Sequence, residues 1–280
     1  MPLNINTNVS SLNAQRYLNS NSNALSKSME KLSSGYRINR AGDDAAGLAL
    51  SEKLRSQIRG SQKAQDNVQD GINVLNITDG AMQSVTDYLQ RMRELAVQAG
   101  NDTYNTAQRS SMKAEFDQLA SGIDQISAAT QFNGVKLMDG SLANMKLQIG
   151  ANDTSGVDTL DLASQNIFNS ANSGALSVSS LNLTSNSDAL AAITAIDKAI
   201  STINTRRGAI GALSNRLETT ATNLATNVEN TSASESRIRN VDVASESAKM
   251  SQYQILQQAA AAMLTQANQA PQLALQLLRG

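Results

Sequence analysis

The chain has 280 residues, of which 40% are hydrophobic, 3% aromatic and 17% charged, and its formal net charge is -1. It contains no Cys and no His, which excludes disulfides, thiol nucleophiles, imidazole acid–base catalysis and Cys/His metal sites. The near-neutral charge argues against binding to nucleic acid, which requires an excess of Lys and Arg.

The N-terminal segment carries few charges and no targeting signal. Residues 1–29 contain only Arg16 and Lys27 as charged side chains. The opening residues lack a basic stretch followed by an apolar run, so no cleavable signal peptide is predicted. No window reaches the roughly 18 apolar residues of a spanning helix, so no membrane insertion is expected. Apolar residues then recur every three or four positions, which predicts an amphipathic helix: Leu25, Met29, Leu32 and Tyr36.

The longest helical pattern follows Gly42-Asp43-Asp44, whose carboxylates suit a helix N-terminus because free N–H groups and the helix dipole favour negative charge there. It stops at Gly100-Asn101-Asp102. A single helix over 45–99 would be about 80 Å long at roughly 1.5 Å per residue, too long to bury its stripe in a compact ball, which predicts a rod. The stripe consists of Leu54, Ile58, Val68, Ile72, Leu75, Met82, Val85, Leu89, Met92 and Ala96.

A second helix is expected after Asn105-Thr106, which can cap it. Beyond this helix the pattern changes to β. Asn133-Gly134 and Asp139-Gly140 are hairpin turn dipeptides, and apolar residues alternate around Leu147 and Leu160. We therefore predict a β-hairpin over about 140–162. Residues 163–187 carry no charge and are rich in Ser and Asn, which predicts a short exposed segment.

The C-terminal third returns to helical spacing from Leu190 to Val228 and from Leu256 to Leu277. Residues 251–280 contain a single charge, Arg279, so a helix there would be poorly solvated alone. We expect the two terminal segments to pair with each other and with other copies of the chain. The alternative is that the two ends are frayed, disordered tails. Both descriptions hold if the ends are disordered in the monomer and become helical once they have a partner.

Long motifs at both ends resemble bacterial flagellin. At the N-terminal end they include KLSSGYRINRAGDDAAGLALSEKLRSQIRG, QRMRELAVQAGNDTY and TQFNGVKLMDG, and at the C-terminal end SRIRNVDVASESAKMSQYQILQQAAAAMLTQANQAPQLALQLL. The similarity covers roughly residues 1–150 and 185–280. The fold class that it implies is mainly α, a long antiparallel helical rod or coiled coil with a small β-hairpin region and paired N- and C-terminal helices.

The resemblance also implies a division into layers. Residues 1–44 and 240–280 would form the inner filament core, and residues 45–239 the outer-core helical rod. The segment 163–187 would stand in place of the outer domains of larger relatives. Packing between subunits would involve large apolar residues of the terminal helices: Leu12, Leu25, Leu32, Leu256, Met263 and Leu277.

The implied function is that of a structural subunit that polymerises into the flagellar filament used for motility, with termini that are disordered in the monomer. Export through the flagellar type III apparatus would place it outside the cell. Its partners would be other flagellin copies, filament cap and hook-associated junction proteins, and an export chaperone on the C-terminal helix. A flagellin-sensing Toll-like receptor would contact Arg91, Leu95 and Glu115, where an exposed Arg and Leu one turn apart beside a carboxylate could form a hot spot.

Enzymatic readings find little support in the sequence. Ser28–Lys31 and Ser110–Lys113 match the S-x-x-K pattern of penicillin-binding enzymes, but the accompanying S-D-N and K-T-G motifs are absent. We therefore expect no enzyme activity, no cofactor and no metal. Two other non-enzymes remain as alternatives, a hook–filament junction protein of the same superfamily and a cytoplasmic coiled-coil scaffold.

Overall fold

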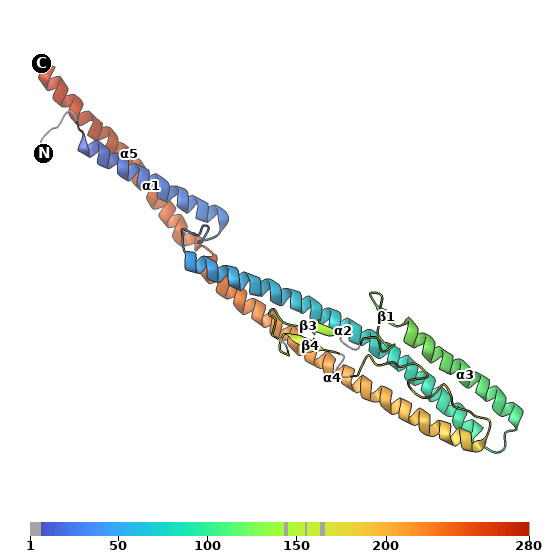
Figure 1. The fold of residues 1–280 in the computed structure, drawn as a ribbon. Helices are drawn as coiled ribbons and strands as arrows, with labels where there is room; N and C mark the ends of the chain where they lie inside the picture. Colours follow the sequence, from blue (N-terminus) through green and yellow to red (C-terminus); the bar gives the residue numbers. More distant parts are fainter. Residues whose placement is uncertain (1–6, 143–144, 155, 163–165, 280) are drawn as a thin grey trace. The chain divides into compact units, whose positions relative to one another are not determined.

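The computed structural model describes residues 7–279 except 143–144, 155 and 163–165, and the side chains only as far as residue 269. This part of the chain is dominated by five helices, joined by short strands and irregular segments (Figure 1). The helices are α1 (Val9–Ser34), α2 (Ala45–Ala99), α3 (Thr106–Ala129), α4 (Asn186–Arg239) and α5 (Val243–Arg279). The prediction of a mainly helical protein with small β elements is confirmed.

The chain forms two compact units. One comprises residues 1–56 together with 230–280, and the other comprises residues 57–229. The long helices α2 and α4 therefore contribute to both units. In the first unit, α1 runs antiparallel to α5, as expected for paired terminal helices (Figure 1).

Helix ends follow the chemistry of the residues that flank them. The Asp44 carboxylate accepts a hydrogen bond from the Gly47 N–H at 2.8 Å, which satisfies a free donor at the start of α2. Asn105 caps α3 in a reciprocal arrangement with Gln108, since each side chain accepts from the other residue's backbone N–H. The predicted helix over 45–99 and its successor capped by Asn105 are both confirmed.

The core of the second unit is built on the apolar stripe of α2. Within residues 57–99, the large side chains predicted for this stripe are almost all buried, from Val68 to Met92. They pack against α3, α4 and the segments between them in one hydrophobic cluster. Each fully buried side chain of this size contributes roughly 1.5–3 kcal/mol, so the cluster is the main source of stability in this unit.

Two short antiparallel hairpins follow α3. Strands β1 (Gln131–Phe132) and β2 (Val135–Lys136) are joined by Asn133-Gly134, where both residues have positive φ, as a type I′ turn requires. Strands β3 (Lys146–Gln148) and β4 (Thr159–Asp161) pair with Leu147 opposite Leu160, inside the range predicted for the hairpin. Val157, in the connection between β3 and β4, is 70% exposed.

The segment 163–187 differs from its prediction. Its described part before α4, residues 166–185, is irregular, but it is not simply exposed, because apolar side chains spaced along it are buried in the core of the second unit. The side-chain oxygens of Asn172 and Asn182 accept from nearby backbone N–H groups, and Asp124 of α3 accepts hydrogen bonds from the Ser173 N–H and hydroxyl. The buried side chains are Ile167, Phe168, Ala171, Leu176, Val178 and Leu183.

Candidate assembly surface on the paired terminal helices

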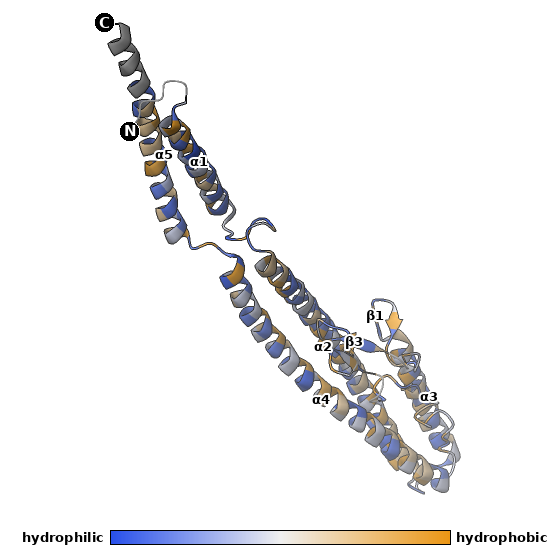
Figure 2. Ribbon diagram, turned by 60° about the vertical axis from the view of Figure 1, so that its left-hand side comes forward, coloured by the Kyte–Doolittle hydropathy of each residue, from blue (hydrophilic) through white to orange (hydrophobic). Residues whose placement is uncertain are grey.

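The pair of helices α1 and α5 lacks a closed apolar core. Within α1, Ser28 is the only buried residue. Over residues 243–269 of α5, where side chains are described, Glu246 is the only buried one. Hydrophobic residues are nevertheless distributed along both helices (Figure 2). The pair therefore has apolar surface that it does not bury by itself.

Large apolar side chains on both helices are exposed. Leu12 is 53% exposed and Met263 is 65% exposed, although both are side chains that proteins usually bury. Exposed apolar side chains gathered on one helix pair make this pair a candidate interaction site. The exposed members of this surface on the two helices, which we call the terminal-helix surface, are Val9, Leu12, Tyr17, Met29, Val243, Ile255, Leu256 and Met263.

The six residues predicted to pack between subunits lie on this helix pair in different states of burial. Leu12, Leu256 and Met263 are exposed, while Leu25 and Leu32 are half-buried. The side chain of Leu277 lies outside the described residues. The structure thus presents three of these side chains to solvent, and their packing between copies stays a prediction.

Polar contacts fix α1 against α5 along its length. Near the N-terminus of α1, the Asn8 side-chain amide donates to the Ala267 carbonyl at 2.7 Å. One turn further, the Ser11 hydroxyl donates to the Asn268 side-chain oxygen at 2.8 Å. At the other end of the pair, the Ser28 hydroxyl donates to Glu246 Oε1 at 2.6 Å. These contacts belong to one antiparallel register. The sequence does not predict them, because Ser and Asn are so frequent in α1 that no single one is marked as a contact residue.

The buried carboxylate of Glu246 is held in its charged form. The hydrogen bond from Ser28 lowers the pKa of Glu246 below the ordinary value, and the neighbouring ammonium groups of Lys249 and Lys31 act in the same direction. Burial opposes this shift, because it penalises the charged form. The first of these ammonium groups, Lys249 Nζ, lies 3.4 Å from Glu246 Oε2.

A second polar cluster lies where α1 ends and α5 begins. The Arg37 N–H donates to the Arg239 carbonyl at 2.7 Å, next to a bridge between Tyr36 and Asn240. The Arg239 guanidinium also donates to Glu52, which lowers the pKa of that carboxyl. The sequence offers no spacing signal for this cluster, since its members are far apart in the chain.

The residues predicted to contact an innate receptor lie in the second unit. Arg91 of α2 forms ion pairs with Glu115 of α3 at 2.8 Å and with Glu94 at 2.9 Å, and Arg91 and Glu115 are exposed. Leu95, however, is only 2% exposed and belongs to the hydrophobic core. The expectation of an exposed Arg–Leu pair is therefore wrong for Leu95, which lies one turn from Arg91 but on the inward side of α2.

Neither S-x-x-K motif forms a nucleophile–base pair. Ser28 Oγ donates to Glu246, and Lys113 Nζ donates to Asp117 Oδ1 at 2.5 Å. Each group is thus engaged by a carboxylate from another position. Among the described residues there is also no group of three or more His, Cys, Asp or Glu side chains that could hold a metal ion.

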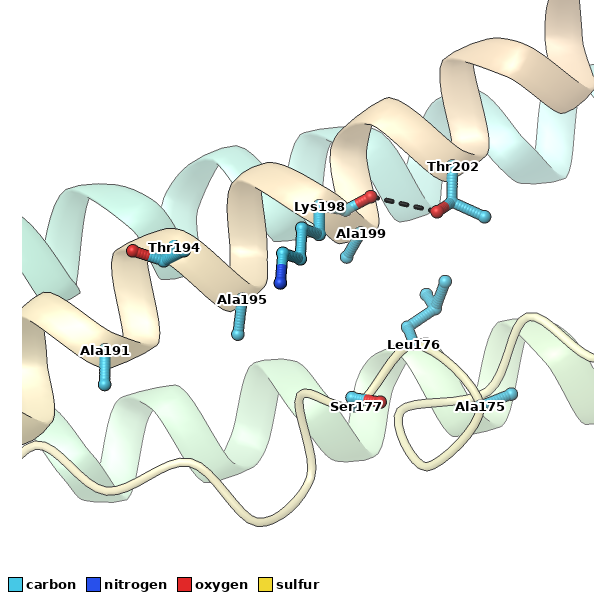
Figure 3. Close-up of a pocket in the computed structure, with 9 residues that line it drawn as sticks. All are labelled: Ala175, Leu176, Ser177, Ala191, Thr194, Ala195, Lys198, Ala199 and Thr202. Carbon is cyan, nitrogen blue, oxygen red and sulfur yellow. Dashed lines mark hydrogen bonds between the residues drawn. The ribbon is translucent and has the colours of Figure 1, made fainter.

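A groove of about 550 Å³ lies in the second unit, between α4 and the turn at 175–177 (Figure 3). Its α4 wall is made of Ala and Thr side chains, and Lys198 is the one charged residue that lines it. Thr202 donates to the Lys198 carbonyl within the helix at 2.9 Å. This lining combines no carboxylate with the single ammonium group of Lys198. In the portion of the chain that the structure describes, no helix is long and apolar enough to cross a membrane.

Comparisons with known proteins agree with this architecture. The bacterial flagellin N-terminal helical region matches residues 5–143, and the bacterial flagellin C-terminal helical region matches residues 193–278. The chain is 47% identical to flagellin of Halalkalibacterium halodurans over 98% of this chain and 99% of the relative. It is 44% identical to flagellin of Bacillus subtilis and 43% identical to the flagellar filament 33 kDa core protein of Treponema phagedenis, each over 98% of this chain and 99% of the relative.

One solved structure shows the same type of fold over most of the chain. A putative flagellar hook-associated protein from Vibrio parahaemolyticus superposes with a TM-score of 0.57 at 18% identity, over 71% of this chain and all of that one. Bacillus cereus flagellin is 32% identical, with a TM-score of 0.49, over 57% of this chain and 88% of that one. The first of these likenesses supports the helical architecture alone.

Proposed function

The chain belongs to the bacterial flagellin family, and from this premise we propose that the terminal-helix surface is where its copies pack together in the filament. Flagellins are structural proteins rather than enzymes, and this chain is a subunit of the flagellar filament. The family assignment also places it in the flagellum and gives other copies of itself as its partners. The relatives that this chain matches over nearly its whole length are filament proteins, which favours the filament subunit over the junction protein and the scaffold.

The observation that carries the proposal is the contrast between the two units. The second unit buries its apolar stripe in one cluster, whereas α1 buries no apolar side chain at all. Exposed groups such as Leu12, Leu256 and Met263 need a partner, and neighbouring copies supply it in a polymer. A contact between different surfaces of successive copies, repeated without closing, yields a helical filament.

The terminal helices would gain most of their burial on assembly. Because the isolated pair encloses so little apolar surface, we expect the termini to be disordered in the monomer and to fold as each subunit adds. The same surface supports an inner core made of residues 1–44 and 240–280, with residues 45–239 outside it. Export in an unfolded state through the flagellar type III apparatus is consistent with this behaviour, and so is a chaperone that covers the C-terminal helix.

The remaining proposed partners rest on the family resemblance. The filament cap and hook-associated junction proteins would meet subunits at the two filament ends. Contact with a flagellin-sensing Toll-like receptor would involve Arg91 and Glu115, which are exposed and paired on adjacent helices. Leu95 is not included, because it is buried in this chain.

Removal of residues 251–280 tests the proposal. The truncated chain should stay soluble and fail to form filaments when seeded with fragments of wild-type filaments, as observed by negative-stain electron microscopy. A full-length chain with Val135→Ser, an exposed apolar residue of the second unit, is the matched control and should polymerise. Normal filaments from the truncated chain would contradict the assignment of this surface.

A further inference from the structure

The two buried side chains of the terminal helix pair contact each other. Ser28 is 2% exposed and Glu246 is 7% exposed, and they are joined by the 2.6 Å hydrogen bond between Ser28 Oγ and Glu246 Oε1. Over residues 9–34 and 243–269, no other side chain is buried. A helix pair of this composition would be expected to bury Leu or Ala at its most enclosed position. Here that position holds a hydroxyl and a carboxylate.

A buried carboxylate strongly restricts what can lie opposite it. Burying a charge is costly unless it is paired and hydrogen-bonded, and removal of one partner leaves that cost uncompensated. Ser28 supplies the hydrogen bond from α1, and Lys249 of α5 lies 3.4 Å from the other carboxylate oxygen. The donor from the opposite helix is therefore the part of this arrangement that depends on how α1 is placed along α5.

The apolar residues place weaker limits on that alignment. Both helices repeat Leu, Ala and Ser, so a shift by one turn would replace apolar contacts by similar ones. The same shift would bring Ala24 or Leu32 opposite Glu246 in place of Ser28. Neither side chain can donate a hydrogen bond, so a shift of four residues in either direction takes the hydroxyl donor of α1 away from the buried carboxylate.

We propose that the hydrogen bond between Ser28 and Glu246 sets the register of α1 along α5, and so selects the alignment in which the terminal helices enter the filament. This inference rests on the proposed function, because it concerns the alignment that the two helices adopt in the assembled filament. Ser28 and Glu246 are positioning residues, and the apolar surface supplies the association itself. A single buried polar contact is known to fix register in paired helices in this way.

The absence of Cys from the chain allows register to be measured directly. Ser11→Cys with Asn268→Cys reports the native alignment, because these side chains are hydrogen-bonded at 2.8 Å. Ser11→Cys with Leu264→Cys, or with Gln272→Cys, reports a shift by one turn in either direction. Full-length filaments are treated with a short thiol cross-linker, and intramolecular products are separated from intermolecular ones on a denaturing gel.

Each reporter pair is combined with changes at the polar contact. In the otherwise unchanged chain, and with Ser33→Ala on the exposed side of α1, the native pair should account for nearly all of the intramolecular product. Ser28→Ala should raise the ratio of shifted to native product about tenfold. Ser28→Thr, which keeps the hydroxyl donor, should restore the native ratio.

The double change Ser28→Ala with Glu246→Leu keeps the test decisive if Ser28→Ala alone fails to polymerise. This chain has no buried charge to satisfy, so it should form filaments in which native and shifted products coexist. Native product alone from the double variant, or failure of both variants to form filaments, would overturn the register assignment. Failure of the unchanged chain to polymerise would instead refute the proposed function.

Discussion

The guanidinium of Arg239 lies over the ring of Tyr36, with its Cζ atom 4.7 Å from the ring centroid. The same guanidinium donates to Glu52, and the Arg239 carbonyl accepts from the Arg37 N–H. One side chain thus connects the last residue of α4 with the segment after α1 and with the first turns of α2. The terminal helix pair begins from this cluster, so its geometry depends on Arg239.

Replacement of Arg239 by Ala should destabilise this cluster. Loss of the stacking on Tyr36 alone should cost about 0.5–1 kcal/mol, and Arg239→Lys should not restore it, because an ammonium lacks the planar face that stacks. The melting temperature of filaments, followed by circular dichroism, checks this. Arg237→Ala, at an exposed position nearby, is the control. Equal melting temperatures for the Arg239→Ala and Arg237→Ala chains would contradict the role given to the stacking.

Acid should weaken the terminal helix pair through Glu246. Its pKa in the folded state is below the ordinary 4.5, chiefly because Ser28 donates to it, and Lys249 and Lys31 reinforce this. A lowered folded-state pKa gives stability that is present above the unfolded-state pKa and lost as the pH falls through the folded value. Filament dissociation, followed by light scattering at pH values from above 4.5 downwards, should therefore be less steep in Glu246→Gln. Exposed Glu229→Gln should leave the curve unchanged, and an identical curve for Glu246→Gln would exclude this contribution.

Substitutions of Leu95 and Arg91 should have different effects, the first on stability and the second on receptor recognition. Leu95→Ala removes a side chain from the core and should cost about 2–5 kcal/mol of the free energy of unfolding. Arg91→Ala changes an exposed ion pair and should leave the melting temperature nearly unchanged. Thermal unfolding of both variants, alongside receptor activation in a reporter cell line, distinguishes the two effects. Activation that is unaffected by Arg91→Ala would remove the proposed receptor contact.

The irregular segment 166–185 should contribute to stability as a core element does. Phe168 is 2% exposed, so Phe168→Ala should cost about 3–5 kcal/mol. Ser180→Ala, at an exposed position of the same segment, should have little effect. Chemical denaturation of the two variants provides the comparison. If both unfold at the same denaturant concentration, the segment does not belong to the core in solution.

Local chemistry was sufficient to predict much of the fold. The spacing of apolar residues and the caps at Asp44 and Asn105 located α2 and α3, and the Asn133-Gly134 dipeptide located a tight turn. Burial in segment 166–185 was missed because its apolar residues follow neither a helical nor a strand period. The contact between Ser28 and Glu246 was also missed. It joins residues more than 200 positions apart, and nothing in the spacing of either residue marks it.

The strongly exposed Val157 has a consequence for protein engineering. A guest peptide inserted beside it would extend the connection between β3 and β4 into solvent and leave Ile149 and Leu160 in the core. The irregular segment around Phe168 is the less suitable acceptor, because an insertion there would displace a buried ring. For display of an epitope on the folded subunit, the connection between β3 and β4 is therefore the preferred graft position.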